Sequence, residues 1–439
     1  MIMPMIQEGR SVGFYGAGRS CLSLMSALPL EKCHVTLRSD KPIDKNVISG
    51  YRIDEIFEGD RAEDDINEDV IFFSPSVRRE RPRLMHALEH GVTFSSDAEL
   101  FFEENRRPVY AVTGSDGKST TATLTHLILN EGKKDCPLIG NVGEPMAAHL
   151  SDMTDGYVCE LSSFMLHYLS PRVRVGCITN INPNHLDWHK DYEEYKETKM
   201  RLAKGCDKLV ISDDCDYIKG AYAIVSGEKD YNELKAKYKA QIYLTLNNGT
   251  ILLNGKPILS PNEISIKEKH NIINLMLAIG MTHTDVDLEA VSRVAKSFCG
   301  LPHRCQRVVT VKGVECIDSS IDSTPARTAA TLKSLDRPVV IILGGRGKRL
   351  DYRQMLPELK RYAVEALIVG ENADEIASAI GNEIKISHFD SLNEAVKHGI
   401  NVAGRCGTLL LSPASTSFDR YKSYAERGEL FKEICNKMQ

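Results

Sequence analysis

The stretch Val109-Tyr-Ala-Val-Thr-Gly-Ser-Asp-Gly-Lys-Ser-Thr-Thr121 decides the fold of this chain. An apolar run rich in strand-forming residues leads into a glycine turn, and a helix patterned with leucines follows. A strand, a glycine-rich loop and a helix that opens with Lys-Ser form a cradle for nucleotide phosphates. The loop amides and the helix N-terminus face the anion, Lys118 adds positive charge, and Ser119 can hold Mg²⁺. The stretch therefore predicts a nucleotide-phosphate site.

The loop is shorter than the commonest phosphate loop, which has four residues between its first glycine and its Gly-Lys pair. Here only Ser115 and Asp116 separate Gly114 from Gly117. The prediction therefore depends on the strand before the loop and the helix after it. The residues expected around the phosphates are Gly114, Ser115, Asp116, Gly117, Lys118, Ser119 and Thr120.

The length and composition of the chain indicate a globular protein with several domains. At 439 residues it is too long for one hydrophobic core and suggests about three domains. Its net charge of -5, with both signs interspersed, gives no nucleic-acid footprint. Residues 1–10 lack the order of a signal peptide, no apolar run approaches the ~18 residues that span a bilayer, and the twelve cysteines include no Cys-x-x-Cys pair. We expect a cytoplasmic monomer with reduced thiols, without nucleic-acid partners or membrane insertion.

Strands that alternate with helices predict an α/β fold with parallel, doubly wound sheets. In the first block, residues 1–97, Gly13, Gly16 and Gly18 resemble a dinucleotide fingerprint, although Cys21 stands where the last glycine is expected. A tight turn that binds no ligand is the alternative. Sheets of this kind bind ligands at the carboxyl ends of their strands. The residues expected to share that rim are Gly16, Gly18, Arg19, Ser20, Arg38, Ser74 and Ser76.

The second block, residues 98–300, carries the phosphate loop, and the third, residues 301–439, repeats the strand–helix rhythm. Strands are expected in the second block over 156–161 and 175–181, and in the third over 338–343, 365–369, 383–387 and 407–411. Several such blocks in series suggest ligands held in clefts between domains.

Polar residues follow two strands of the second block. Glu160 ends an otherwise apolar strand, where a carboxylate can bind the nucleotide's Mg²⁺; a strand-end glutamate that faces water is the alternative. His185, Asp187 and His189 cluster in the next loop. A histidine with a carboxylate beside a metal–phosphate site is a candidate metal ligand, and an ordinary polar loop residue is the alternative.

Three further segments carry charged or amide side chains. Lys196 and Lys199 lie in a charged helix, and periodicity alone places both in solvent. Asn271 and Asn274 share one helix face and could cap, pack or contact a purine. Lys348 closes a glycine-rich run that could be a second phosphate site.

Six segments in order resemble the Mur ligase family. They are Gly114–Thr120, Gly140–Gly143, Glu160–Ser163, Asn180–Asp187, His270–Asn274 and Gly300–Arg304. Within that family, the C-terminal stretch 411–428 is most similar to the enzyme that adds D-glutamate. The resemblance covers the whole chain, and six ordered segments are far more specific than one glycine loop.

The resemblance implies ATP-dependent amide synthesis on a peptidoglycan precursor. The carboxylate of UDP-N-acetylmuramoyl-L-alanine takes the γ-phosphoryl group of ATP, and the amine of D-glutamate then displaces phosphate. Lys118 and Mg²⁺ reduce the repulsion between the carboxylate and the polyanion. The implied domains are a Rossmann-like N-terminal UDP-binding domain, a central P-loop ATPase-like domain with a parallel sheet, and a Rossmann-like C-terminal amino-acid-binding domain.

The resemblance also implies roles for single residues. Ser119 and Glu160 hold the nucleotide's Mg²⁺, His185 holds a second metal, and Lys199 becomes a carbamylated metal ligand, against the surface position that periodicity gives it. The implied catalytic residues are Lys118, Glu160, His185 and Lys199. Beyond the loop, the implied ATP contacts are Asn271, Asn274 and Arg304. The implied substrate contacts are Gly18, Arg19, Ser20, Arg38, Ser76, Asn141, Ser162, Ser323, Lys348, Ser417 and Tyr424.

Departures from the family pattern leave alternatives open. Ile321 replaces a family lysine, so the aspartate of that segment is Asp318 or Asp322 and Arg327 could supply the missing charge; Met165 replaces a glutamine. The alternative functions are a sibling ligase for another amino acid, a folylpolyglutamate-type ligase, a nicotinamide-dependent oxidoreductase built on the first glycine turn, and a nucleotide-binding regulator. The oxidoreductase leaves the phosphate loop unexplained.

Overall fold

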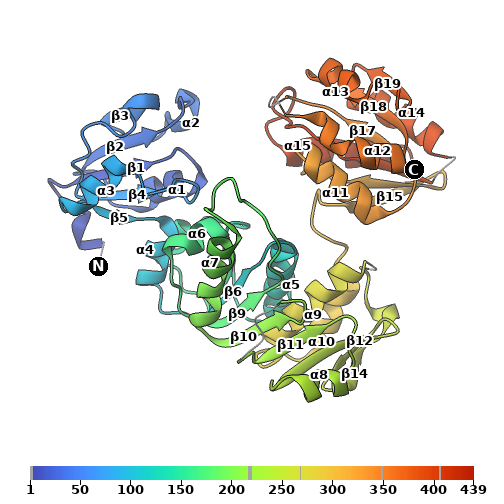
Figure 1. Cartoon of the computed structure of the whole chain (residues 1–439), viewed down its shortest axis with the longest axis horizontal. Coiled ribbons are helices and arrows are strands. Elements are labelled where there is room, and N and C mark those ends of the chain that lie inside the picture. The colour runs from blue at the N-terminus through green and yellow to red at the C-terminus, as the bar shows by residue number, and fades with distance from the viewer. Residues whose placement is uncertain (1–2, 216–219, 267, 348–349, 405–406) are drawn as a thin grey trace. The chain divides into compact units, whose positions relative to one another are not determined.

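The computed structural model describes residues 3–215, 220–266, 268–347, 350–404 and 407–439. The chain divides into two compact units, Met1–Phe298 and Cys299–Gln439. Within the described residues it forms three sheets of five, nine and six strands, and most strand pairs are parallel (Figure 1). The predicted α/β class is confirmed. The domain boundaries at residues 97 and 300 stay a prediction.

The N-terminal sheet is parallel and has the order β3-β2-β1-β4-β5. Its strands are β1 Ser11–Tyr15, β2 His34–Ser39, β3 Glu55–Glu58, β4 Val70–Phe73 and β5 Thr93–Ser95, and its helices are α1 Arg19–Ala27, α2 Lys45–Ile48 and α3 Pro82–Glu89. The strand order reverses between β1 and β4, the point at which such sheets bind ligands. Gly16 follows β1 with φ +108, and a Cβ there would lie 2.4 Å from Ser74 Oγ, so the turn requires glycine.

The central sheet has the order β14-β13-β12-β11-β10-β9-β6-β8-β7. Its strands are β6 Val109–Thr113, β7 Leu138–Gly140, β8 Tyr157–Glu160, β9 Val173–Ile178, β10 Cys206–Ser212, β11 Ala223–Ser226, β12 Ile242–Asn247, β13 Thr250–Leu253 and β14 Lys256–Leu259. The helices are α4 Asp97–Glu104, α5 Lys118–Glu131, α6 Ser163–Tyr168, α7 Tyr192–Lys204, α8 Tyr231–Lys237, α9 Lys269–Thr282 and α10 Leu288–Ser297. Because β6 is buried along its whole length between β8 and β9, its carboxyl end delivers the phosphate loop to the middle of the sheet.

The unit Cys299–Gln439 has a sheet of order β15-β16-β20-β17-β18-β19, in which β15 is antiparallel to β16. Its strands are β15 Gln306–Val311, β16 Val314–Asp318, β17 Val339–Leu343, β18 Ala363–Val369, β19 Ile386–Phe389 and β20 Thr408–Leu411. Its helices are α11 Pro325–Leu335, α12 Leu356–Tyr362, α13 Ala373–Ile380, α14 Leu392–Ala403 and α15 Tyr424–Asn436. Ile341 packs in one apolar cluster with Leu359, and its neighbour Ile342 packs in another with Phe431. Both faces of the sheet are therefore covered.

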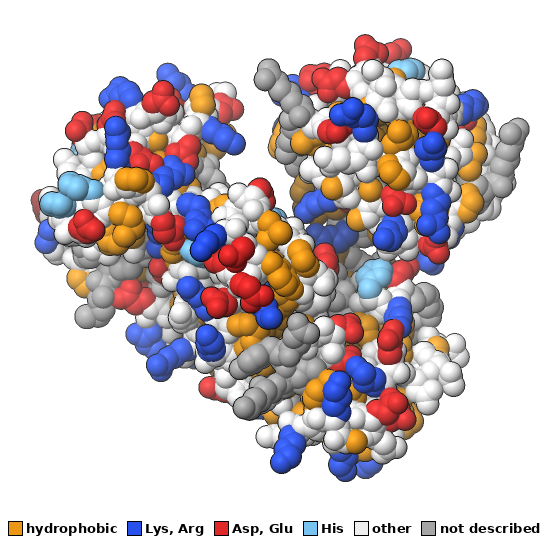
Figure 2. All heavy atoms as spheres, in the orientation of Figure 1, with side chains coloured by type: hydrophobic (Ala, Val, Ile, Leu, Met, Phe, Trp, Pro, Cys, Tyr) orange, Lys and Arg blue, Asp and Glu red, His pale blue; other side chains and the backbone are white. Residues whose placement is uncertain are grey.

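The surface mixes charges of both signs. Figure 2 shows basic and acidic side chains interspersed over the visible face of each unit. In the part of the chain that the structure describes, no helix combines the length and apolar character needed to cross a bilayer.

Candidate active site

The loop between β6 and α5 depends on two glycines with positive φ. Gly114 has φ +147, and Gly117, which caps α5, has φ +78. A Cβ would lie 1.9 Å from Thr179 Oγ1 at Gly114 and 2.3 Å from Asn274 Oδ1 at Gly117. Both positions therefore exclude side chains, and the loop leads directly into the positive end of the α5 dipole.

The loop is tied to the residues after β9 and to α7. The Ser115 amide donates to the Asn180 carbonyl over 2.9 Å, and the Ser115 hydroxyl lies 2.8 Å from Tyr195 Oη. The Thr179 hydroxyl donates to the Asp116 carbonyl over 2.5 Å. These bonds fix the loop before any ligand arrives.

The first turn of α5 carries Lys118, Ser119 and Thr120. Lys118 Nζ donates to the carbonyls of Gly114 and Ser115 at 3.0 and 2.8 Å, so the cation lies against the loop. Ser119 is half-buried and Thr120 is buried. These side chains lie where a helix N-terminus binds an anion.

Lys199, on α7, is 1% exposed, so the prediction from periodicity that it is a surface residue is wrong. Its Nζ donates to the Gly114 carbonyl over 2.7 Å and lies 3.4 Å from Thr113 Oγ1. Burial, followed by the Lys118 cation, holds the pKa of Lys199 well below its usual range, although Glu160 opposes this. A neutral amine under the phosphate loop is a nucleophile, and its burial demands a chemical reason.

Glu160, at the end of β8, is fully buried, so the alternative that it faces water is wrong. Its Oε1 accepts from Asn141 Nδ2 over 2.6 Å. Its Oε2 is buried and has no hydrogen-bond partner among the described residues. A buried carboxylate oxygen without a donor is suited to a cation.

The three polar residues that the sequence places together after β9 differ in burial. His185 is exposed, has φ +54 and packs its ring on Phe164, with centroids 4.9 Å apart, and Asp187 is exposed. His189 is instead 2% exposed, and burial lowers its pKa to about 4, so its ring is neutral at pH 7. The His189 amide donates to the His185 carbonyl over 2.9 Å and both rings pack against Phe164, so the two histidines remain neighbours although only the His189 ring is buried.

The two asparagines of α9 differ in burial. Asn274 is 6% exposed and its Oδ1 accepts from the Thr121 hydroxyl over 3.3 Å. Asn271 is half-buried, and its Oδ1 lies 3.5 Å from Asn274 Nδ2. Asn274 therefore packs against the base of the phosphate loop, with Asn271 one turn nearer the surface.

Arg38 lies at the carboxyl end of β2 beside the Gly16 turn, whose amide donates to its carbonyl over 2.7 Å, but its side chain turns inward and away from the rim. It is fully buried, and its Nε donates to Glu68 Oε1 over 2.6 Å. Its remaining nitrogens donate to the carbonyls of Ala62, Asp64 and Asp65. All its nitrogens are thus engaged inside the domain, and it stabilises the loop before β4.

Arg19 connects the N-terminal sheet to the central one. Its guanidinium donates to the carbonyls of Gly140, Asn141 and Gly143 at 2.9 to 3.2 Å. It thereby holds the segment that carries Asn141 beside Glu160. Gly18 caps α1, Ser20 lies in its first turn, and the Ser76 carbonyl accepts from Trp188 Nε1 over 2.8 Å.

Two of the remaining site predictions lie on other caps and turns. The Ser162 hydroxyl caps α6 by accepting from the Met165 amide over 3.2 Å. Arg304 is half-buried and lies in the unit Cys299–Gln439.

The predicted D-glutamate contacts lie on several segments of that unit. Ser417 is buried, Tyr424 begins α15 and is 43% exposed, and Ser323 is half-buried. Lys348 lies outside the described residues. Asp322 accepts from Ser412 Oγ over 2.8 Å, and burial raises its pKa.

The sequence points to Asp318 in a buried polar cluster of this unit, but not to its neighbours His303 and Arg427. His303 Nδ1 lies 2.7 Å from Asp318 Oδ2. Arg427, which is 3% exposed, donates to the Ser320 carbonyl over 2.9 Å, and burial lowers its pKa to about 10. In the sequence, His303 and Arg427 are marked only by lying within segments that resemble the Mur ligase family. Hydropathy by itself predicts that Arg427 is exposed.

Comparisons with known proteins identify two family domains in this chain. Residues 112–282 match the Mur ligase middle domain, and residues 303–415 match the Mur ligase, glutamate ligase domain. The UDP-N-acetylmuramoylalanine--D-glutamate ligase of Ruminiclostridium cellulolyticum is 36% identical over 390 residues, 84% of this chain and 83% of the relative. Its namesake from Acetivibrio thermocellus is 34% identical over 388 residues, with the same coverage.

Solved structures share the fold at low identity. UDP-N-acetylmuramate-alanine ligase MurC from Thermotoga maritima aligns with 98% of this chain and 100% of its own, with a TM-score of 0.58 and 17% identity. MurF from Acinetobacter baumannii aligns with 99% and 92%, with a TM-score of 0.51 and 16% identity. The similarity to the D-glutamate ligases, together with the two matched domains, shows that the chain belongs to the Mur ligase family.

Proposed function

We propose that this chain is an ATP-dependent ligase that joins D-glutamate to UDP-N-acetylmuramoyl-L-alanine. The observation that carries the proposal is a phosphate loop flanked by the buried Lys199 amine and the unpaired Glu160 oxygen, within the described residues. The relatives that bear the name of this activity are 34–36% identical over most of the chain.

The reaction has two steps. An oxygen of the alanyl carboxylate attacks the γ-phosphorus of ATP, the bond to the bridging oxygen breaks, and ADP leaves. The uncharged amine of D-glutamate then attacks the acyl carbon, the bond from that carbon to the phosphate oxygen breaks, and phosphate leaves as the amine loses a proton. Lys118 and the loop amides neutralise charge on the γ-phosphoryl group and so lower the barrier to the first step.

The donor set fits Mg²⁺. Ser119 and Glu160 offer oxygen ligands beside the phosphate site, and Glu160 Oε2 lacks a donor within the described chain. His185 is proposed to hold a second ion. The low pKa of Lys199 favours the neutral amine that can add to CO₂, which converts the lysine into a carbamate with two ligand oxygens. Bound Mg²⁺ supplies charge neutralisation during phosphoryl transfer.

The remaining predicted contacts stay in the proposal, except Arg38, whose nitrogens are engaged inside the domain. For ATP they are Asn271, Asn274 and Arg304. For the muramoyl nucleotide they are Gly18, Arg19, Ser20, Ser76, Asn141 and Ser162. For D-glutamate they are Ser323, Lys348, Ser417 and Tyr424.

An amino-acid panel tests the proposal. Phosphate release is measured with ATP, Mg²⁺ and UDP-N-acetylmuramoyl-L-alanine, and each amino acid is added in turn. We expect turnover with D-glutamate and not with L-alanine, L-lysine or meso-diaminopimelate. Preference for one of the latter would assign the chain to a sibling activity, and ATP binding without turnover on any acceptor would point to a regulator.

A further inference from the structure

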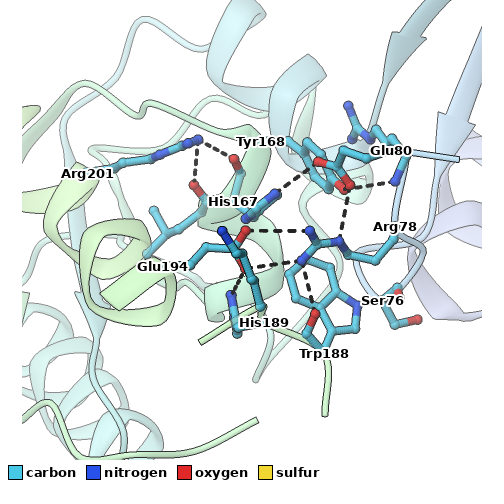
Figure 3. Close-up of polar contacts among 12 residues, drawn as sticks. Ser76, Arg78, Glu80, His167, Tyr168, Trp188, His189, Glu194 and Arg201 are labelled. Carbon is cyan, nitrogen blue, oxygen red and sulfur yellow. Dashed lines mark hydrogen bonds and ion pairs between the residues drawn. The ribbon is translucent and has the colours of Figure 1, made fainter. Parts of the chain in front are cut away.

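Two histidines and a glutamate meet between α6 and α7. They are His167 on α6, His189 in the loop before α7, and Glu194 in the first turn of α7 (Figure 3). One ligand atom from each lies within 4.8 Å of the other two. Among the described residues, this is the one group of three His, Cys, Asp or Glu side chains so arranged for a metal ion.

His189 has the environment of a ligand without its metal. Its side chain is completely buried, and neither ring nitrogen makes a hydrogen bond to the described chain. Its Nδ1 lies 3.3 Å from Glu194 Oε2. Ligands about 2.0–2.1 Å from a tetrahedral Zn²⁺ lie roughly 3.3 Å apart, so this pair is already spaced as two corners of a zinc site.

His167 is oriented by a carboxylate on its other side. Its Nε2 lies 3.0 Å from Glu80 Oε1, and Glu80 Oε2 accepts from the Tyr168 hydroxyl over 2.8 Å. The Nδ1 of His167 is buried and has no hydrogen-bond partner in the described residues. With the Nε2 proton donated to Glu80, the lone pair is on Nδ1, which is the carboxylate–histidine pair typical of zinc ligands.

Arg78 balances the charge without blocking the site. Its guanidinium lies 3.2 Å from Glu194 Oε2 and from Glu80 Oε2, and also donates to the Trp188 carbonyl over 3.0 Å. Two carboxylates and one guanidinium leave a net charge of -1 around two imidazoles. Glu194 Oε2 also accepts from the Lys190 amide over 2.8 Å. A carboxylate has about four lone-pair sites, so Glu194 can bind Arg78, the Lys190 amide and a cation together.

We propose that His167, His189 and Glu194 bind one Zn²⁺ ion, with water as a fourth ligand. Two imidazoles and a carboxylate suit zinc, whereas the oxygen ligands at the phosphate loop suit Mg²⁺. The ion would join α6 to the start of α7. Since His185 lies in the loop before α7 and Lys199 lies further along α7, the zinc would fix both with respect to the phosphate loop.

Zinc titration of the full-length chain tests the site. The protein is stripped with a chelator and titrated with Zn²⁺ against a chromogenic chelator, without nucleotide and with excess Mg²⁺ to occupy oxygen sites. We expect one tight Zn²⁺ per chain, and Co²⁺ in its place should give the intense visible absorption of a tetrahedral complex. His167→Gln and His189→Gln should each weaken binding by at least ~10-fold.

His86→Gln is the matched control, because it removes an exposed histidine on α3 of the same unit and should leave the tight site unchanged. Loss of the site in that variant with retention in His189→Gln, or no stoichiometric binding to the wild type, would overturn the proposal. If a histidine variant does not fold, anomalous diffraction at the zinc edge from the wild-type protein decides the matter. A peak bonded to His167, His189 and Glu194 supports the site, and no peak there contradicts it.

Discussion

At the scale of single residues, the surroundings of Lys199 favour a neutral amine where a lysine is ordinarily a cation. The side chain has the composition of a surface cation, but α7 places it under the phosphate loop, where Gly114 and Thr113 surround its amine. Burial of a cation is costly unless the group becomes neutral or gains a partner. A lysine kept neutral in this position fits the proposed carbamate.

Replacement of Lys199 tests whether its amine is needed for the reaction or only for the stability of α7. We expect Lys199→Ala to lower phosphate release by at least ~100-fold, because a ligand of the activating site is lost. Small carboxylates added to the assay should restore part of the activity. Lys204→Ala, at the exposed end of the same helix, should behave as the wild type. Full activity of Lys199→Ala without additives would remove the carbamate from the mechanism.

Asp97 is a second buried ionisable residue, and its effect on the pH dependence of stability can be measured. It begins α4 and is 1% exposed. Burial raises its pKa to about 6, although the nearby Ser20 hydroxyl opposes the rise. Because the folded state then binds the proton more tightly than the unfolded state, Asp97 contributes less stability as the pH rises from about 4 to 6, and the loss persists above pH 6.

Asp97→Asn should therefore gain stability relative to the wild type as the pH rises. The difference in unfolding free energy between the two proteins should change by about 2 kcal/mol between pH 4 and pH 8 in denaturant titrations. Asp207→Asn, at an exposed position of β10, serves as the control and should show a smaller change. A difference independent of pH would mean that Asp97 titrates normally.

At the scale of elements, the structure confirms the strand–helix rhythm but moves some boundaries. The charged helix expected to contain Lys196 and Lys199 is α7, Tyr192–Lys204. The strand expected over 383–387 is instead β19, Ile386–Phe389. Gly381 ends α13 with φ +59, and the exposed residues after it complete a turn before pairing with β18 begins. The local composition predicts that a strand is present, but the pairing with β18 determines at which residue β19 begins.

The phosphate loop gives a test at this scale. Gly117→Ala should cost about 1–2 kcal/mol in backbone strain, and its Cβ would also clash with Asn274. We expect the KM for ATP to rise by roughly tenfold or more, since the loop and α9 must move apart. Gly313 has φ +80, and a Cβ added there would meet nothing within 4 Å, so Gly313→Ala imposes similar strain without the clash. An equal rise in KM in both variants would contradict the role of the close approach.

At the scale of the whole molecule, each unit has its own core. The unit Cys299–Gln439 closes its sheet within itself and covers both faces with separate apolar clusters. Among the described residues, its sheet and these clusters include none from the other unit. This is the anatomy of a domain that can fold alone.

Residues 299–439, expressed as a separate chain, should therefore fold. We expect dispersed amide signals in NMR spectra and a cooperative thermal transition, because the segment keeps the whole of its sheet. Residues 1–298, expressed and measured in the same way, provide the comparison with the other unit. Non-cooperative melting of the 299–439 segment would show that it depends on the rest of the chain.

The sequence by itself determined the phosphate loop, the α/β class and the family. Each of these is encoded locally: glycine spacing permits the positive φ angles of Gly114 and Gly117, and alternating apolar runs specify strands and helices. The resemblance carried by the ordered segments also pointed to Lys199, which periodicity placed in solvent.

Only the tertiary structure decided the partners of the buried charges. Arg38 pairs with Glu68, 30 residues away, Arg19 holds carbonyls more than 120 residues away, and His167 pairs with Glu80, 87 residues away. Sequence patterns predict that a charged residue is exposed. Its burial costs little only when the fold supplies an opposite charge or a hydrogen bond. Such contacts join segments distant in the chain, so local spacing does not encode them.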